Sequence, residues 1–296
     1  MGCNLCPRAC GVERENGERG ACGQGSVVRV ARAALHFFEE PAISGTRGSG
    51  TVFFCGCSLG CVFCQNREIS RGETLGTPMD RHALAETMLR LQEEGAHNIN
   101  LVTPTHFADR VAETLSDVRG KLKIPVVYNS SGYENLSTLR MLEGLIDVYL
   151  PDFKYASPET ARRYSSAPDY PKVAVTAIRE MVRQTGGLRF DENGILQRGV
   201  IVRLLVLPGE RKDAIEVLKL LASAVDPTEI RLSLMSQYTP EFALDTPYPN
   251  LHRRLTRFEY DSVWETACAL GFAGYSQARE SASARYTPDF SNHNAK

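Results

Sequence analysis

The stretch TVFFCGCSLGCVFCQN at residues 51–66 places three cysteines directly after an apolar, β-prone segment. Cys57, Cys61 and Cys64 follow one another with the spacing C-x3-C-x2-C. A loop at the carboxyl end of a strand can direct several side chains at one site, and three thiolates leave one position of a metal centre open. Because a [4Fe–4S] cluster normally takes four cysteines, this loop predicts a cluster in which one iron accepts a further ligand.

Cys55 leaves an alternative open. It lies two residues before Cys57, and the two side chains would share a face if both belonged to the strand. A fourth thiolate would close the site, as in structural zinc or a non-catalytic iron–sulfur protein for electron transfer or assembly. Cys55 ends the apolar run VFFC, where a buried thiol behaves as a small hydrophobic group. We therefore leave Cys55 out of the predicted ligands.

Outward from this loop, apolar β-prone runs alternate with amphipathic helical stretches. The predicted strands are TVFFC from Thr51, NINLV from Asn98, PVVYN from Pro125, DVYLP from Asp147, VIVRLLVLP from Val200, EIRLSLM from Glu229 and a short one near Ala273. The predicted helices cover residues 81–94, 105–118, 136–143, 170–183, 213–224 and 260–270. This alternation predicts an α/β fold with a parallel sheet, a partial (βα)6-type barrel whose function lies at the carboxyl ends of its strands. A turn at Asn193 and Gly194 predicts a hairpin before the fifth strand.

The pattern divides the chain into three parts. Residues 1–50 are rich in Cys, Gly and Arg and are expected to form a small metal-binding arm with one short strand at residues 26–33. Residues 51–276 carry the barrel. Residues 277–296 are polar and lack apolar periodicity, which predicts a frayed tail.

The arm has its own cysteine motif. Cys3, Cys6, Cys10 and Cys22 are spaced C-x2-C-x3-C-x11-C, and four thiolates make a closed coordination shell. Tetrahedral zinc and an auxiliary iron–sulfur cluster both fit this spacing. We expect a structural role for this second site, because the charged residues around the cysteines indicate exposure.

Composition excludes several classes of protein. With 43% hydrophobic and 23% charged residues, the 296-residue chain has the composition of a globular protein. The formal net charge of −1 provides no basic field, so a nucleic acid partner is not expected. No apolar window reaches the length of a membrane span, so we expect no membrane partner. Eight of the nine cysteines fall within the first 64 residues, which favours metal ligation in a cytoplasmic protein over disulfides.

The spacing of Cys57, Cys61 and Cys64, with aromatic Phe63 just before the last cysteine, resembles the signature of the radical S-adenosylmethionine (SAM) superfamily. The resemblance implies that the open iron binds the amino and carboxylate groups of SAM, beside Phe63. It also implies a reductant such as flavodoxin or ferredoxin. One-electron reduction then cleaves SAM to a 5′-deoxyadenosyl radical, which abstracts a substrate hydrogen atom.

Within that superfamily, residues 50–235 are most similar to the activating enzymes of glycyl-radical enzymes, and resemble pyruvate formate-lyase activase. Asp152 and Lys154 match the D-x-K motif that helps to hold SAM, although an ion pair at the barrel mouth is the simpler alternative. Asn129 and Arg203 correspond to polar positions near the cofactor, and a buried Arg203 would need a partner carboxylate. The implied substrate is a glycine on a partner protein; a small molecule, a peptide or RNA is the alternative.

The sequence departs from these relatives in two places. After the second strand most of them carry Gly-Gly-Glu, whose backbone receives the amino group of SAM, but this chain has LVTPTHF. Thr103 or Thr105 would then offer a hydroxyl or carbonyl group, whereas His106 equally suits the start of a helix. Pyruvate formate-lyase activase also lacks the four-cysteine arm. At the end of the sixth strand, Met235, Gln237 and Tyr238 are expected near the substrate, with core packing as the alternative for Met235.

Overall fold

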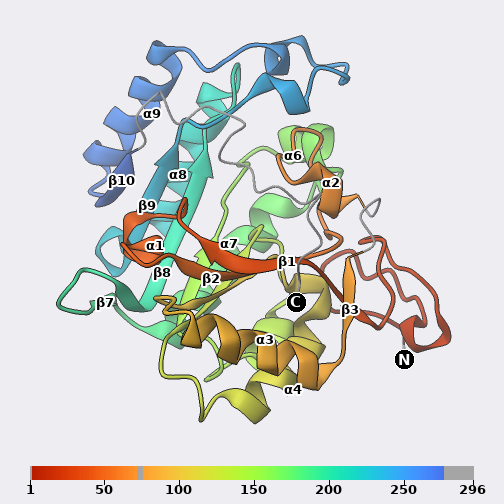
Figure 1. Cartoon of the computed structure of the whole chain (residues 1–296). Helices are drawn as coiled ribbons and strands as arrows, with labels where there is room; N and C mark the ends of the chain where they lie inside the picture. The colour runs from red at the N-terminus through yellow and green to blue at the C-terminus, as the bar shows by residue number, and fades with distance from the viewer. Residues whose placement is uncertain (1, 72–75, 277–296) are drawn as a thin grey trace.

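The computed structural model describes residues 2–71 and 76–276. A ten-stranded sheet with the order β10-β9-β8-β6-β5-β4-β2-β1-β3 curves through the molecule, and β7 pairs with β8 beside it (Figure 1). The strands are β1 Val28–His36, β2 Ser49–Phe54, β3 Thr77–Met79, β4 Ile99–Val102, β5 Val126–Ser130, β6 Val148–Pro151, β7 Arg189–Phe190, β8 Leu196–Leu205, β9 Ile230–Met235 and β10 Gly274–Ser276.

The parallel part of the sheet confirms the predicted fold class. β2, β4, β5, β6, β8, β9 and β10 pair in parallel in that order, and each corresponds to one of the apolar runs in the sequence. Apart from the edge strand β10, whose Gly274 and Ser276 are exposed, these strands are largely buried, which explains why they read as continuous apolar runs rather than alternating ones. The fold is therefore an α/β partial barrel, open at its two edge strands.

The helices pack around the outside of the sheet (Figure 1). They are α1 Pro41–Ser44, α2 Arg67–Ser70, α3 Arg81–Glu93, α4 Ala108–Val118, α5 Leu136–Met141, α6 Pro158–Ser165, α7 Tyr170–Thr185, α8 Arg211–Ala224 and α9 Arg257–Ala269. The helix expected from residue 105 opens instead as a 3-10 turn over Thr105–Phe107. α9 begins earlier than predicted because Thr256 and Glu259 form a capping box. Among the described helices, none is long and apolar enough to cross a membrane.

β1 extends the sheet beyond the predicted boundary at residue 50. The short strand expected at residues 26–33 exists but continues to His36, and it pairs antiparallel with both β2 and β3. Arg29 and Arg32 interrupt its apolar pattern, although Val28 and Val30 are buried. Residues 28–50 therefore contribute to the barrel sheet, and the cysteine arm proper is shorter than the sequence suggests. The predicted tail at residues 277–296 lies outside the described residues.

The hairpin before the fifth parallel strand is also confirmed. β7 and β8 pair antiparallel, and the Gly194 N–H donates to the Asp191 carbonyl at 3.1 Å across the turn. The loops after β2, β5, β6 and β9 lie at the carboxyl ends of the parallel strands. This arrangement brings together side chains that are far apart in the sequence.

Candidate active site

The three cysteines of the loop after β2 line one cavity. Cys57, Cys61 and Cys64 share a cavity of about 240 Å³ with residues from the ends of β4, β5, β6, β8 and β9. Gly56 begins the loop with φ +85°, a conformation that favours glycine. A Cβ there would lie 2.6 Å from the Cys22 carbonyl oxygen, so the arm packs directly against this turn.

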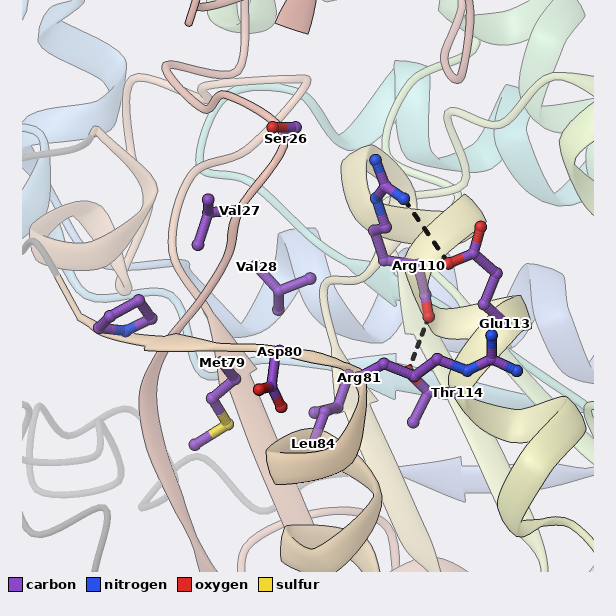
Figure 2. A pocket seen from close by; sticks show the side chains of 11 residues that line it. Ser26, Val27, Val28, Met79, Asp80, Arg81, Leu84, Arg110, Glu113 and Thr114 are labelled. Atoms are coloured by element: carbon purple, nitrogen blue, oxygen red, sulfur yellow. Dashed lines mark hydrogen bonds and ion pairs between the residues drawn. The ribbon is translucent and has the colours of Figure 1, made fainter. Parts of the chain in front are cut away.

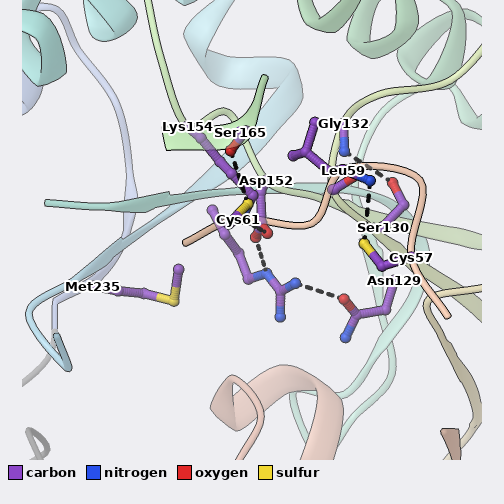
Figure 3. Close-up of polar contacts among 12 residues, drawn as sticks. Cys57, Leu59, Cys61, Asn129, Ser130, Gly132, Asp152, Lys154, Ser165 and Met235 are labelled. Atoms are coloured by element: carbon purple, nitrogen blue, oxygen red, sulfur yellow. Dashed lines mark hydrogen bonds and ion pairs between the residues drawn. The ribbon is translucent and has the colours of Figure 1, made fainter. Parts of the chain in front are cut away.

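Each of the three sulfur atoms has a hydrogen-bond donor nearby, and Figure 3 shows those of Cys57 and Cys61. The Leu59 N–H lies 3.4 Å from Cys57 Sγ, the Ser70 hydroxyl 3.5 Å from Cys64 Sγ, and the Ser165 hydroxyl 3.0 Å from Cys61 Sγ. Burial, and then the neighbouring thiols, raise the pKa of Cys57 and bring that of Cys64 to about 12. The buried pocket does not favour free, charged thiolates, yet hydrogen-bond donors lie beside the sulfur atoms. This combination suits cysteines whose negative charge is compensated by a bound metal.

Cys55 lies outside this group. Its side chain is fully buried and packs with Ala31, Phe53 and Ile69 on the β1 side of the sheet. Burial raises the pKa of this thiol to about 11. Cys55 does not line the cavity, which agrees with its treatment as a small hydrophobic residue.

Asp152 and Lys154 follow β6 and project into the same cavity. Lys154 Nζ donates to Asp152 Oδ2, and Arg203 Nε, from β8, donates to Asp152 Oδ1 at 2.9 Å. Burial alone would raise the pKa of Asp152, but Arg203 and Lys154 outweigh it and hold that pKa below its ordinary value. The Tyr170 hydroxyl donates to the backbone carbonyl of Asp152 at 2.9 Å and accepts from the Lys154 N–H at the same distance, fixing this strand end.

The second carboxyl group in the network is Glu39, which the sequence analysis missed. Glu39 accepts hydrogen bonds from Asn100 at 3.0 Å and Asn129 at 3.2 Å, and it lies 3.3 Å from an Arg203 nitrogen. Asn129 in turn accepts from Arg203 at 2.5 Å (Figure 3). A buried arginine needs a partner carboxylate, and Arg203 has two, Asp152 and Glu39. The only sequence signal for Glu39 is an acidic residue just after a strand.

The other predicted site residues separate into two groups. Phe63, Thr103, Met235 and Gln237 line the cavity, whereas Tyr238 packs behind it. Thr105, the alternative to Thr103, does not line the cavity, and its hydroxyl donates to buried Glu134 at 2.9 Å. His106 lies in the 3-10 turn before α4, where one of its ring nitrogens is 2.7 Å from the Cys55 carbonyl oxygen. Burial lowers the pKa of His106 to about 4, which suits a packed neutral ring.

Ser131 is a further cavity residue that the sequence analysis did not single out. It lies just after β5, two residues beyond Asn129, and lines the cavity wall. Its hydroxyl is buried and has no hydrogen-bond partner among the described residues. An unpaired buried hydroxyl is costly, so a polar ligand group is expected to face it.

The chemistry of these donors fits a cluster and SAM. Within residues 2–71 and 76–276, no group of three or more His, Cys, Asp or Glu side chains is arranged around a single-ion position. A cluster with several irons does not need its cysteines to converge on one point, and three cysteines with one open iron suit a ligand that itself coordinates metal. The cations and amides beside the cysteines can bind the carboxylate and hydroxyl groups of such a ligand.

A second cavity of about 410 Å³ adjoins the first, with Phe38, Glu39, Arg203, Met235 and Gln237 in both walls. Glu40 Oε2 in its wall is buried and has no hydrogen-bond partner among the described residues.

A third cavity of about 410 Å³ is separate from both. It lies outside the barrel between residues 26–28, β3, α3 and α4 (Figure 2). Arg110 and Glu113 lie at its edge with nitrogen and oxygen 3.6 Å apart, and Val28, Met79 and Leu84 form its apolar wall. It contains none of the predicted site residues.

Comparison with known proteins agrees with the fold. The chain belongs to the radical SAM superfamily, whose family profile matches residues 51–222. An uncharacterized protein of Methanocaldococcus jannaschii is 31% identical over 274 residues, which cover 90% of this chain and 74% of that protein. The family implies a [4Fe–4S] cluster and SAM.

Two solved structures were matched to this chain. A radical SAM methyltransferase from Sphaerobacter thermophilus superposes with a TM-score of 0.51 at 15% identity, over 77% of this chain and 66% of that one. SuiB of Streptococcus suis bound to S-adenosylmethionine gives a TM-score of 0.49 at 14% identity, over 75% of this chain. The chain spans about half the length of SuiB, 48%.

Proposed function

We propose that this chain binds SAM in the cysteine-lined cavity, cleaves it reductively, and uses the radical to abstract hydrogen from a glycine on a partner protein. The observation that supports the first part is that the three loop cysteines and the Asp152–Lys154 pair line one cavity. When bound, the cluster supplies one electron to the sulfonium of SAM, and the 5′-deoxyadenosyl radical that leaves takes the substrate hydrogen. A reductant such as flavodoxin or ferredoxin provides the electron.

The chain's own residues bind and orient SAM in this proposal. Lys154 and Arg203 provide positive charge for the α-carboxylate, and Asp152 keeps both cations in place. Asn129 and the unpaired hydroxyl of Ser131 offer hydrogen bonds to the ribose or the amino group.

Thr103 and Phe63 complete the proposed SAM site. The carbonyl or hydroxyl of Thr103 takes the role that Gly-Gly-Glu has in the activases. Phe63, 7% exposed between Tyr164 and Tyr238, provides a rigid apolar wall that excludes water from the reacting atoms.

The unpaired carboxyl oxygen of Glu40 supports the proposal that the substrate carries an amide or another hydrogen-bond donor. The adjoining cavity is large enough for a peptide segment, and the unpaired Glu40 oxygen would accept from its backbone N–H. The choice of a glycine on a protein rests on the resemblance to glycyl-radical activases. A small molecule with an N–H group is the second candidate, because the same carboxyl group would accept from it.

Formation of 5′-deoxyadenosine tests the reaction. The chain is reconstituted anaerobically with iron and sulfide, reduced with dithionite and given SAM, and the product is measured by mass spectrometry. We expect 5′-deoxyadenosine from the wild type and none from Cys57→Ala. A fully loaded wild-type cluster that yields no product, with or without added substrate extract, would instead support the electron-transfer alternative.

Deuterium transfer tests the substrate class. An extract of the source cells grown on α-deuterated glycine is split by size into protein and small-molecule fractions, and each is added to the reduced enzyme with SAM. Deuterium in 5′-deoxyadenosine from the protein fraction alone is the expected result. Deuterium from the small-molecule fraction alone, or from neither fraction, would contradict a protein glycine as substrate.

A further inference from the structure

The four cysteines of the arm are free and mutually close. Residues 3–12 fold into a closed loop, because the Cys3 N–H donates to the Val12 carbonyl at 2.9 Å and the Gly11 N–H donates to the Cys3 carbonyl at 3.1 Å. A Cβ on Gly20 would lie 2.9 Å from Cys10 Sγ and 3.8 Å from the sulfur of Cys22. The backbone there comes too close to the thiols to accept a side chain.

Backbone amides lie close to the arm's sulfur atoms. Those of Arg8, Val12 and Gln24 neighbour the sulfur atoms of Cys6, Cys10 and Cys22, each two residues earlier in the chain. In the catalytic loop, the Leu59 N–H lies in the same relation to Cys57 Sγ, at 3.4 Å. Such donors stabilise thiolates, and hydrogen bonds to sulfur are a standard part of thiolate metal sites.

Arg8 connects the arm to the catalytic loop. It lies between Cys6 and Cys10, and its guanidinium donates to the carbonyls of Ser58 at 2.8 Å, Leu59 at 3.2 Å and Ser165 at 2.7 Å, and to that of Ser166. The first two belong to the segment between Cys57 and Cys61. The third belongs to the serine whose hydroxyl contacts Cys61 Sγ.

We propose that Cys3, Cys6, Cys10 and Cys22 bind a structural metal, either a zinc ion or an iron–sulfur cluster, and that this metal holds Arg8 against the loop that binds the radical SAM cluster. In the described part of the chain the four sulfur atoms do not surround a single-ion position. A metal would therefore draw them together, which the glycine-rich turns of the arm permit. With four thiolates the shell is closed, so this site binds no substrate. The proposed link to the second cluster rests on the proposed function; metal binding by the arm does not.

Metal analysis of a variant without the catalytic cysteines tests the arm alone. The full-length Cys57→Ala/Cys61→Ala/Cys64→Ala chain is reconstituted in two parallel experiments, with Zn²⁺ or with iron and sulfide, desalted and analysed. We expect about one zinc per chain in the first experiment, or iron with matching sulfide in the second. Adding Cys22→Ser should abolish this metal, whereas Cys268→Ser, at an exposed cysteine on α9, should not. No metal in either experiment, or equal metal in the Cys22→Ser variant, overturns the proposal.

The link through Arg8 is tested in the chain with all its cysteines. Arg8→Gln removes the charge and most of the four contacts, and we expect it to retain the arm metal. The readout is how fast a chelator removes the SAM-responsive electron paramagnetic resonance signal of the reduced catalytic cluster. We expect that rate to rise several-fold in Arg8→Gln and to be unchanged in Cys268→Ser. An unchanged rate in Arg8→Gln overturns the link, while a wild type without a SAM-responsive signal contradicts the proposed function instead.

Discussion

Asp152→Asn removes the carboxylate that two buried cations share. Arg203 Nε lies 2.9 Å from Asp152 Oδ1, and Lys154 Nζ contacts the other oxygen. The three side chains are 14–16% exposed, so water compensates little for the loss. After the substitution Arg203 still has Glu39 and Asn129, but among the described residues Lys154 keeps no carboxylate within ion-pair distance.

The cost follows from distance and burial. At an effective dielectric constant of about 20, unit charges 2.9 Å apart attract by about 6 kcal/mol, and the desolvation of the carboxylate offsets part of this. Removal of one partner from a buried ion pair typically costs about 3–5 kcal/mol. We therefore expect Asp152→Asn to lower the free energy of unfolding by about 3 kcal/mol or more.

Anaerobic urea denaturation of the reduced chain, followed by circular dichroism, measures this loss. Asp261→Asn is the matched control, because Asp261 lies 3.0 Å from Arg257 in a pair that is mostly exposed to water. At an almost equal distance, that pair is expected to contribute about 0–1 kcal/mol. If Asp152→Asn were no more destabilising than Asp261→Asn, the reasoning from burial would be refuted.

The difference between wild type and Asp152→Asn should also depend on pH. The folded-state pKa of Asp152 is lowered below its ordinary value of 3.8. The carboxylate therefore contributes stability that is complete well above pH 3.8 and is lost as the pH falls through that value toward the folded-state pKa. The stability gap should be constant between about pH 5 and 7 and shrink in more acidic solution.

Three further substitutions separate the roles of other residues. Cys55→Ser should keep both the cluster iron and 5′-deoxyadenosine formation, whereas Cys57→Ala should lose both. Iron and sulfide analysis measures the first and mass spectrometry the second, and loss of iron in Cys55→Ser would make Cys55 a ligand. Lys154→Met should weaken SAM binding by at least about tenfold, or 1.4 kcal/mol, with unchanged iron content, and equal affinity in a binding titration would exclude Lys154 from the SAM site. Thr256→Ala breaks the capping box of α9 and should cost about 1 kcal/mol of stability without changing turnover, whereas a loss near zero would show that Glu259 alone caps the helix.

The parallel strands and the cysteine loop could be predicted because their signals are local. The apolar runs that become β2, β4, β5 and β6 are buried on both faces, and such runs need no partner to be recognised. The side chains of Asp152 and Lys154 are two residues apart after a strand, so their common direction also follows from the chain alone.

Glu39 could not be predicted as a site residue because its position depends on pairing. It follows β1, whose arginines interrupt the apolar pattern by which a strand is recognised. The antiparallel pairing of β1 with β2 places Glu39 in the barrel interior. Ser131 carries no sequence signal of its own, and only the structure shows its hydroxyl buried and without a hydrogen-bond partner among the described residues, beside the cavity. Residues 28–50 were assigned to the arm for the same reason: strand pairing over long distances has no local signature.

The contacts of Arg8 also set an order of events during synthesis. Its carbonyl partners at Ser165 and Ser166 lie 157 and 158 residues further along the chain. A growing chain folds from its amino end, so the arm leaves the ribosome long before α6 exists. The catalytic loop becomes fully clamped only once α6 has docked. The contacts that join Arg8 to both the catalytic loop and α6 are therefore completed late in synthesis.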